Sequence, residues 1–562
     1  MSPSLTDHNW WRSAVVYQIY PRSFADGNND GTGDITGMIE HLDHLSALGV
    51  DAVWVSPWYP SPLHDGGYDV ADYCDIHPEF GTLEQADEFV RQAHERGIRV
   101  IIDLVPNHCS NEHPLFQAAL AAGPGSPERD MFIFRDGKGE NGELPPTNWG
   151  AMFGGGAWER VTEADGSPGQ WYCHMFAPEQ PDWNWENPAV SALFDDVLRF
   201  WFDRGIDGFR IDVADSLFKD QTFPDLPVDP VTGYGTMEKF EGSPLWDRPH
   251  MAAHQRHWRA IADEYAHSDL GPRVFVSEAY LPSARRIHYV AEGRLHTSFN
   301  FEFLLSAWSP ESLRQVISQS LAEHQEVGAP TTWVLDNHDN IRSASRFGKH
   351  PSGLDYSRER VPDEVHWAEA MAKAPTDIAL GRRRARASAL LMLALPGGAY
   401  VYQGQELGLE EVEDLPEDKL QDPTWKRSGH TIRGRDGCRV PLPWSGSEPP
   451  FGFGVDAEPW LPQPAHWADL SVEAQSGDPD SMLELYRRLL AERHSNPALG
   501  EGGMMWDDTS KDVLSFTREP GFRCVVNFGE EPVPVEGEVI AASIPLAEGL
   551  LPSDAAVWLR TS

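Results

Sequence analysis

A series of short apolar runs that alternate with longer amphipathic segments constrains the fold more than any other feature of the sequence. Each run is apolar on both faces of an extended strand, which is typical of strands buried in a parallel sheet. Eight strands that alternate with helices indicate an α/β fold of the (β/α)8 TIM-barrel type. The predicted strands begin near residues 14, 51, 98, 206, 273, 296, 331 and 398, and the run HTSFNFEF near 296 is the weakest of them.

The connection between the third and fourth predicted strands differs from the others. Most connections carry apolar residues at helical spacing and end at Gly or Pro, as in LEQADEFVRQAHERG. Residues 105–184 are instead rich in Gly and Pro, and they are far too many for an ordinary loop between a strand and a helix. We therefore predict that 105–184 form an inserted subdomain of a barrel made by residues 1–104 and 185–496.

The last part of the chain shows two further changes of pattern. An irregular excursion rich in Pro, Trp and charge, at about 407–475, follows the eighth predicted strand. After Pro497 the pattern changes to short alternating runs separated by turns, as in VLSFTREPGFRCVVNFGEE. This pattern is typical of antiparallel strands, so residues 497–562 are predicted to form a C-terminal β-sandwich domain.

The charge of the chain excludes some classes of partner. With 45 Lys and Arg against 87 Asp and Glu, the formal net charge is −42. Such an acidic surface repels nucleic acid and anionic membranes, so we expect neither as a partner. No run of 18 apolar residues is present, and no membrane span is predicted. Neutral or cationic ligands remain possible, and the chain is expected to be a monomer or a homodimer.

Cysteine usage and the N-terminal sequence indicate a compartment. The chain has five scattered cysteines without a CxxC pair, a pattern that favours free thiols over disulfides or a zinc site. Residues 1–10 are polar and lack the basic and apolar regions of a secretion signal. A cytoplasmic location is therefore predicted.

Charged and imidazole side chains gather where the predicted strands end. The carboxyl ends of barrel strands form the face on which TIM-barrel enzymes build their sites. We therefore expect these side chains to lie in one pocket. They are Asp103 and His108 after the third strand, Arg210 and Asp212 at the fourth, Glu278 at the fifth, and His338 and Asp339 after the seventh.

The segment GFRIDV places two opposite charges on a strand that is otherwise apolar. Strand periodicity sends Arg210 and Asp212 to one face, while Phe209 and Ile211 point to the other, toward the helices. An arginine beside Asp212 should keep its carboxylate ionised, as a nucleophile requires. Taken alone, such a pair is more often a structural ion pair than a catalytic one.

Further acids at matching strand ends favour catalysis over a structural ion pair. Several buried carboxylates in one pocket, here with Glu278 and Asp339, are costly unless they perform chemistry. Glu278 lies in the apolar run FVSEAY, a setting that suits a general acid. His108 and His338, each taken alone, could equally be satisfied core histidines. The acid-rich set lacks the HExxH spacing of a zinc enzyme.

Eight segments resemble a known enzyme family, in the same order along the chain. DLVPNH, GFRIDV, FVSEAY and DNHDN resemble the four signature segments of the α-amylase superfamily, glycoside hydrolase family 13. QPDWN, PGGAYVYQGQE, RDGCRVPLPW and DPDSMLELYRRL resemble segments of its α-glucosidase and oligo-1,6-glucosidase branch. The resemblance covers the chain from Trp10 into the C-terminal domain.

This resemblance implies roles for individual residues. Asp212 would be the nucleophile, Glu278 the general acid/base and Asp339 the third carboxylate that stabilises the transition state of a retaining mechanism. Arg342 would close the pocket beyond the glucose O4, which makes an exo-acting enzyme. The substrate-binding residues implied are Asp65, Tyr68, His108, Arg210, His338 and Arg342.

The loop DGNNDGTGD, residues 26–34, offers hard oxygen atoms at alternate positions. Such a set is typical of a cation loop, although an Asx-rich turn has the same composition. The resemblance implies a structural Ca²⁺ or Mg²⁺ here and adds a backbone oxygen of the loop. The predicted ligands are Asp26, Asn28, Asp30, Thr32 and Asp34, and no organic cofactor is expected.

The residues around the expected catalytic acids give conflicting signals about the substrate. In the family that the chain resembles, Val213 after the nucleophile leans toward α-1,6 linkages, whereas Ala214 and the segment EAY after Glu278 lean toward maltose. We expect an α-glucosidase that releases glucose from short α-glucosides such as maltose, with transglucosylation left open. The alternatives are an oligo-1,6-glucosidase, a sucrose- or trehalose-acting transferase or isomerase, and an inactive sugar-binding homologue.

Overall fold

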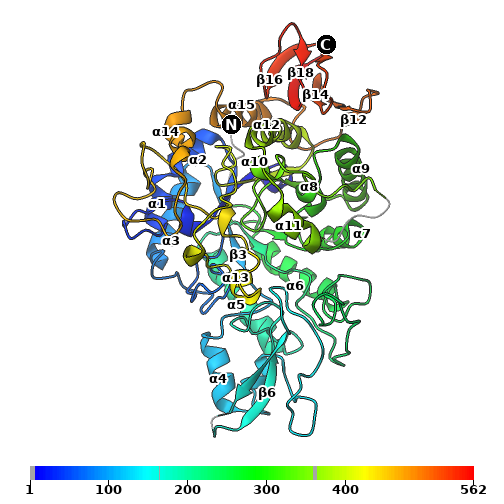
Figure 1. Cartoon of the computed structure of the whole chain (residues 1–562). Helices are drawn as coiled ribbons and strands as arrows, with labels where there is room; N and C mark the ends of the chain where they lie inside the picture. Colours follow the sequence, from blue (N-terminus) through cyan, green and yellow to red (C-terminus); the bar gives the residue numbers. More distant parts are fainter. Residues whose placement is uncertain (1–6, 164, 359–363, 562) are drawn as a thin grey trace.

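An eight-stranded parallel sheet lies at the centre of the molecule (Figure 1). The computed structural model describes residues 7–163, 165–358 and 364–561. Residues 1–6, which carry part of the prediction that no secretion signal is present, lie outside the described residues. In spatial order the strands are β10 (Thr332–Val334), β11 (Gly398–Tyr402), β1 (Val15–Ile19), β2 (Ala52–Val55), β3 (Arg99–Leu104), β7 (Gly208–Ile211), β8 (Val274–Ser277) and β9 (Thr297–Ser298).

The two edges of this sheet approach each other. The backbone N–H of Asn300, just after β9, donates to the carbonyl of Thr332 in β10 at 3.1 Å. Every neighbouring pair within the sheet is parallel. The sheet is therefore a nearly closed barrel, which confirms the predicted TIM-barrel fold.

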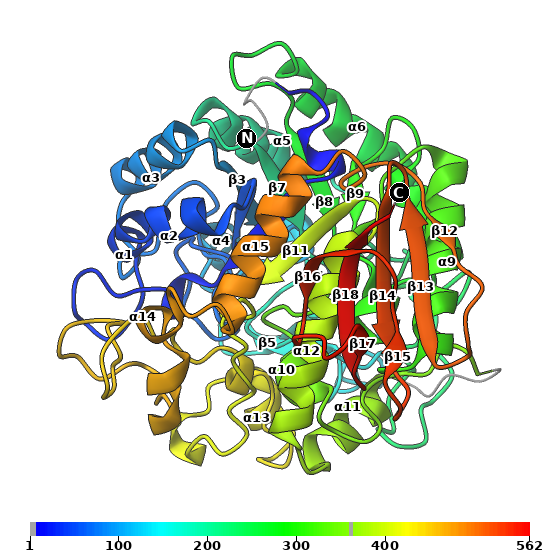
Figure 2. The same cartoon turned by 90° about the horizontal axis from the view of Figure 1, so that it is seen from above.

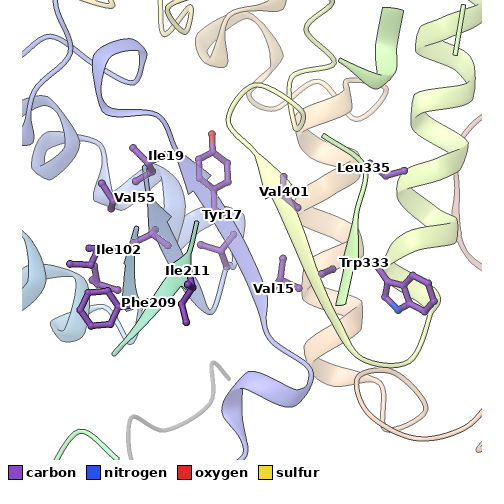
Figure 3. Packing of buried hydrophobic residues seen from close by; sticks show 14 of the residues in the cluster. Val15, Tyr17, Ile19, Val55, Ile102, Phe209, Ile211, Trp333, Leu335 and Val401 are labelled. Atoms are coloured by element: carbon purple, nitrogen blue, oxygen red, sulfur yellow. The ribbon is translucent and has the colours of Figure 1, made fainter. Parts of the chain in front are cut away.

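Successive residues of a barrel strand enter different parts of the core. Val15, Tyr17 and Ile19 of β1 belong to the large apolar cluster between the sheet and its helices (Figure 3). Val16 belongs to a second cluster together with Trp54 of β2. This alternation follows from the two-residue period of a strand, and it explains why the runs are apolar on both faces.

Helices surround the barrel when it is viewed from above (Figure 2). Local signals set several of their ends. Thr82 and Gln85 form a capping box at the start of α3, and Asn187 caps α5 with Pro188 in its first turn. The helices between the barrel strands are α1 (Ile35–Glu40), α2 (Leu42–Leu48), α3 (Leu83–Glu95), α5 (Pro188–Asp203), α6 (His250–Glu264), α7 (Ser283–Arg286), α8 (Phe301–Leu305), α9 (Pro310–Val327), α10 (Ser343–Arg346), α11 (Glu364–Lys373) and α12 (Ile378–Ala394).

The long connection between β3 and β7 forms a separate lobe, drawn in cyan at the bottom of Figure 1. It contains α4 (Pro114–Ala122) and an antiparallel sheet of β4 (Phe134–Arg135), β6 (Pro168–Cys173) and β5 (Trp158–Thr162). This confirms the subdomain that was predicted after the third strand. Its predicted boundaries, 105 and 184, stay predictions.

After β11 the chain runs through an irregular region and then into a second sheet. The irregular region includes α13 (Pro423–Arg427) and α14 (Val472–Gln475), and α15 (Met482–Ser495) follows it. The five-stranded antiparallel sheet confirms a C-terminal β domain, while the boundary at 497 and the sandwich arrangement stay predictions. Its strands are β12 (Met505–Trp506), β13 (Val513–Arg518), β14 (Phe522–Asn527), β18 (Ala555–Arg560) and β16 (Glu538–Ala542), and β15 (Val533–Pro534) pairs separately with β17 (Leu550–Leu551).

The C-terminal sheet packs on the barrel through α12. The indole N–H of Trp558 in β18 donates to the carbonyl of Leu390 in α12 at 3.0 Å. Trp558 is fully buried. None of the described helices has the length and apolarity that a membrane crossing requires.

Candidate active site

Arg210 lies at the centre of the strand ends and contacts three carboxylates. One of its terminal nitrogens, Nη1, lies 2.8 Å from Asp103 and 2.5 Å from Asp212, and Nη2 lies 2.9 Å from Glu278. Asp103 is in β3, Arg210 is in β7, and Glu278 directly follows β8. Three neighbouring strands therefore deliver their acids to one guanidinium.

The alternation predicted for GFRIDV is confirmed. Phe209 and Ile211 belong to the cluster between sheet and helices, and both are labelled in Figure 3. The ring of Phe209 lies 5.2 Å from that of Phe202 in α5. Arg210 and Asp212 instead contact each other on the opposite face of the strand.

The charge state of Asp212 differs from the one predicted. Burial raises the pKa of Asp212 well above its ordinary value, and the negative charge of Glu278 adds to this effect. Arg210 lowers the pKa of Asp212, but its influence is smaller than that of burial or of Glu278. A hydrogen bond between the carboxyl groups of Asp212 and Glu278 also raises the pKa of Asp212. A second carboxyl group so close to Asp212 thus disfavours its charged form when no ligand is bound.

Asp339 is held in the opposite state, as a carboxylate. Its carboxyl group lies 2.9 Å from Arg435, 3.1 Å from Arg439 and 3.3 Å from the ring of His338. Burial alone raises the pKa of Asp339, but His338, Arg435 and Arg439 outweigh it and hold the pKa below its ordinary value; the two arginines carry the lasting charge, since burial lowers the pKa of His338. The site thus combines one acid of lowered pKa, Asp339, with one of raised pKa, Asp212.

Asp65 joins this group from the loop after β2. Arg435 lies 2.7 Å from one of its carboxyl oxygens, and the amide of Gln180 donates to the other at 3.0 Å. Burial raises the pKa of Asp65 to about 6, against the lowering effect of Arg435. Arg435 therefore connects Asp65 with Asp339.

Aromatic and imidazole rings enclose the acids. The ring of Tyr68 stacks on His338 with centroids 5.2 Å apart, and its hydroxyl donates to Asp103 at 3.1 Å. Nε2 of His108 lies 3.2 Å from the carbonyl oxygen of Tyr68. Burial lowers the pKa of His108 to about 3, so this ring is neutral. The structure thus brings Tyr68, His108 and His338 to the strand ends where they were predicted.

The sequence is similar to known enzymes over most of its length. Residues 18–502 match the family model described as "Alpha amylase, catalytic domain". The chain belongs to this family. A probable alpha-glucosidase of Rhizobium meliloti (strain 1021) is 35% identical, with 99% of this chain and 97% of the relative covered. The oligo-1,6-glucosidase IMA5 of Saccharomyces cerevisiae (strain ATCC 204508 / S288c) is 34% identical, with 91% and 90% covered.

A solved structure extends the similarity to the whole fold. The alpha-glucosyl transfer enzyme XgtA superposes with a TM-score of 0.83 at 33% identity, and 98% of this chain and 99% of that chain are covered. Together with the family model, these relatives confirm the resemblance that the signature segments indicated.

Arg342 does not occupy the place predicted for it in the pocket. Its side chain is fully buried and donates to the carbonyl oxygens of Gln403 at 2.9 Å and Cys438 at 2.7 Å. A guanidinium held in this way faces the protein interior. In this member of the alpha-amylase family, Arg435 takes the position beside Asp65 and Asp339.

Sequence reasoning missed Arg435 and Arg439 as site residues. Both lie in RDGCRVPLPW, a segment that was noted only for its resemblance to the α-glucosidase branch. A short 3-10 turn, Asp436–Cys438, separates them. Two arginines four residues apart, in a loop that follows a barrel strand, are the signal that could have identified them.

The predicted cation loop folds as a network of turns in which carboxylates accept hydrogen bonds from loop amides. Asp26 accepts from Asn29 at 2.6 Å, Asp30 accepts from Thr32 at 2.8 Å, and Asp34 accepts from the backbone N–H of Asn28 at 2.9 Å. Asp34 also caps α1. No group of three His, Cys, Asp or Glu side chains is gathered for a metal in the described part of the chain.

The donor chemistry of this loop nevertheless fits a hard cation. Burial raises the pKa of Asp34, and the negative charge of Asp26 adds to that shift. Two acids that repel each other at close range are stabilised by a cation between them.

Proposed function

We propose that the chain is a retaining, exo-acting α-glucosidase that releases glucose from the non-reducing end of short α-glucosides such as maltose. The observation that carries the proposal is that Arg210 binds Asp212 and Glu278 at once, at 2.5 Å and 2.9 Å. A double displacement on a sugar needs two adjacent carboxyl groups, one to attack and one to carry a proton. Relatives named alpha-glucosidase and oligo-1,6-glucosidase support the same activity.

In the first step, a carboxylate oxygen of Asp212 attacks the anomeric carbon while the bond to the leaving oxygen breaks. Glu278 gives its proton to that oxygen, so the aglycone departs as an alcohol. The mechanism therefore requires that Glu278 carries a proton and Asp212 does not when the sugar enters. Arg210 then compensates the charge that remains on Asp212.

In the second step, Glu278 takes a proton from a water molecule, and the oxygen of that water attacks the anomeric carbon. The bond to Asp212 breaks, and glucose leaves with its original anomeric configuration. Asp339, held ionised by Arg435 and Arg439, stabilises the positive charge that the ring develops in both transition states.

Asp65 and Arg435 account for exo action. They stand as one ion pair beside Asp339 and offer both acceptors and donors to the hydroxyls of a single glucose ring. A site closed in this way accepts the end of a chain and excludes its middle. Tyr68, His108 and His338 complete the enclosure around the ring.

The same site also determines which glycosidic linkage is cleaved and whether water or a sugar accepts the glucosyl group. Val213 and the oligo-1,6-glucosidase relative favour an α-1,6 linkage, and the similar α-glucosyl transfer enzyme favours transfer to a sugar instead of water. Rates on maltose, isomaltose, sucrose and trehalose, with analysis of transfer products, separate these possibilities. We expect maltose to be the best of the four substrates.

The decisive test of the proposal uses two conservative variants. Asp212→Asn removes the attacking oxygen and Glu278→Gln removes the proton donor, so each should lower kcat/KM on maltose by about 1,000-fold or more. Asp263→Asn, in an ion pair within α6, is the control and should keep the full rate. NMR should show α-glucose as the first product. Wild-type rates in either variant, or β-glucose first, would overturn the proposal.

We further propose a structural Ca²⁺ or Mg²⁺ held by Asp26, Asn28, Asp30, Asp34 and the backbone oxygen of Thr32. No organic cofactor takes part in the proposed chemistry. A cytoplasmic location is supported by the five cysteines, all of which are unpaired. The enzyme is proposed to act as a monomer or homodimer, without nucleic acid or membrane.

A further inference from the structure

Val213, the residue directly after Asp212, has an unusual backbone conformation. Its φ is +45°, in the left-handed region. A β-branched residue rarely adopts this conformation because its Cβ crowds the backbone. Strained conformations of this kind persist where the surrounding structure holds them, often at functional sites.

The left-handed turn brings the backbone of Val213 against Glu278. The N–H of Val213 donates to Oε2 of Glu278 at 3.0 Å. The same oxygen lies 2.9 Å from Nη2 of Arg210. The next amide, that of Ala214, donates to the backbone carbonyl of Glu278 at 2.9 Å. Two donors therefore fix the carboxyl group, and one of them depends on the strained residue.

The side chain of Val213 supplies the packing that holds this backbone in place. It is 9% exposed and belongs to a cluster shared by the inserted subdomain and the loop after β7. Trp149 and Met175 contribute from the subdomain, and Leu245 and Trp246 contribute from the loop. This cluster is separate from the core of the barrel.

We propose that Val213 is a positioning residue for Glu278, because its packing against this cluster holds the left-handed backbone whose amide orients the carboxyl group. The proposal rests on the function proposed above, in which Glu278 protonates the leaving oxygen. It couples the inserted subdomain to proton transfer without any contact between Val213 and the reacting atoms.

Two substitutions separate this role from simple packing. Val213→Ala removes packing but keeps the Cβ that disfavours the left-handed region, so the backbone relaxes and the amide leaves Glu278. Val213→Gly removes more packing but adopts a positive φ freely. On maltose we expect kcat/KM to fall about tenfold in Val213→Ala and less in Val213→Gly. Lost packing alone predicts the reverse order.

A second readout uses a leaving group that needs no proton. The leaving group of α-glucosyl fluoride is fluoride, which needs no proton from Glu278. The kcat/KM of Val213→Ala on this substrate should therefore fall by less than about twofold. Equal losses of kcat/KM on both substrates would overturn the proposal.

Val161 provides the matched control. It lies in β5 of the subdomain at the same 9% exposure, and it is not among the residues with positive φ. Val161→Ala should lower the stability of the protein, and Val161→Gly should lower it further. Neither variant should change the ratio of kcat/KM on maltose to kcat/KM on α-glucosyl fluoride. If Asp212→Asn is inactive while the Val213 variants match the wild type, this inference fails and the proposed function stands. If Asp212→Asn is fully active, the proposed function itself fails.

Discussion

Arg435 makes ion pairs with three carboxylates that lie far apart in the sequence. Its side-chain nitrogens lie 2.7 Å from Asp65, 2.9 Å from Asp339 and 2.5 Å from Asp422. A planar guanidinium can serve three partners at once because its donors form a rigid fork, whereas a lysine ammonium is a single point charge. The geometry of the proposed glucose site therefore depends on the shape of this side chain as well as on its charge.

Arg435→Lys keeps the charge and removes the fork, so it tests this dependence. We expect kcat/KM on maltose to fall about 100-fold, because Asp65 and Asp339 are no longer held together in the transition state. Steady-state kinetics measure the change. Arg204→Lys, which alters a partly exposed pair with Asp87, is the control and should have no effect. Normal kinetics in Arg435→Lys would show that the fork is not required.

Strand periodicity was sufficient to predict the side-chain directions of Arg210 and Asp212, because a strand fixes alternate faces. No such rule applies to Arg435, which lies in an irregular loop 370 residues away from its partner Asp65. The buried position of Arg342 was unpredictable for the same reason. Loop residues close to a strand end or in a signature segment, such as His108 and His338, could be placed from the sequence, whereas Arg435 and Arg342 could not.

At the scale of elements, seven of the predicted strands are clear, and the eighth is much shorter than its run suggested. HTSFNFEF yields only Thr297–Ser298 before α8 begins. The side chain of Asn300 accepts the N–H of Phe303 and starts this helix. The alternating aromatic residues that looked like a strand are therefore divided between a short strand and a helix.

The loop 26–34 is the element whose stability should depend on a cation. Removal of Ca²⁺ and Mg²⁺ by a chelator should lower the melting temperature by about 3 °C, because a cation that binds only the folded state stabilises it. Thermal unfolding with and without chelator measures this. Asp26→Asn should abolish the difference, and Asp263→Asn should preserve it. An identical melting temperature in both conditions would leave only a network of turns.

The whole molecule buries several neutral histidines, and this predicts its behaviour in acid. Burial lowers the pKa of His108, His174 and His254 to about 3 each, from 6.5. Between these two pH values the unfolded chain binds protons that the folded protein does not bind. Each of these histidines should therefore contribute a fall of about 1.4 kcal/mol per pH unit in the free energy of unfolding as the pH decreases from 6.5.

Unfolding in urea between pH 8 and pH 4 checks this prediction. His254 lies between Trp185 and Trp258, and His254→Gln should reduce the slope with pH. The exposed His267→Gln is the matched control and should leave the slope unchanged. An unchanged slope in His254→Gln would contradict the predicted neutral state of His254, because buried acids such as Asp65, whose pKa is raised, act on the total in the opposite sense.

The ion pair between Asp65 and Arg435 forms late during synthesis of the chain. Asp65 leaves the ribosome 370 residues before its partner. At about 5–20 residues per second, this delay lasts roughly 20–75 s. Late in that interval Asp65 and Asp339 still lack Arg435 as a partner, although the barrel strands have already been made. A nascent chain that stalls before residue 435 can thus approach its fold while its sugar site remains unassembled.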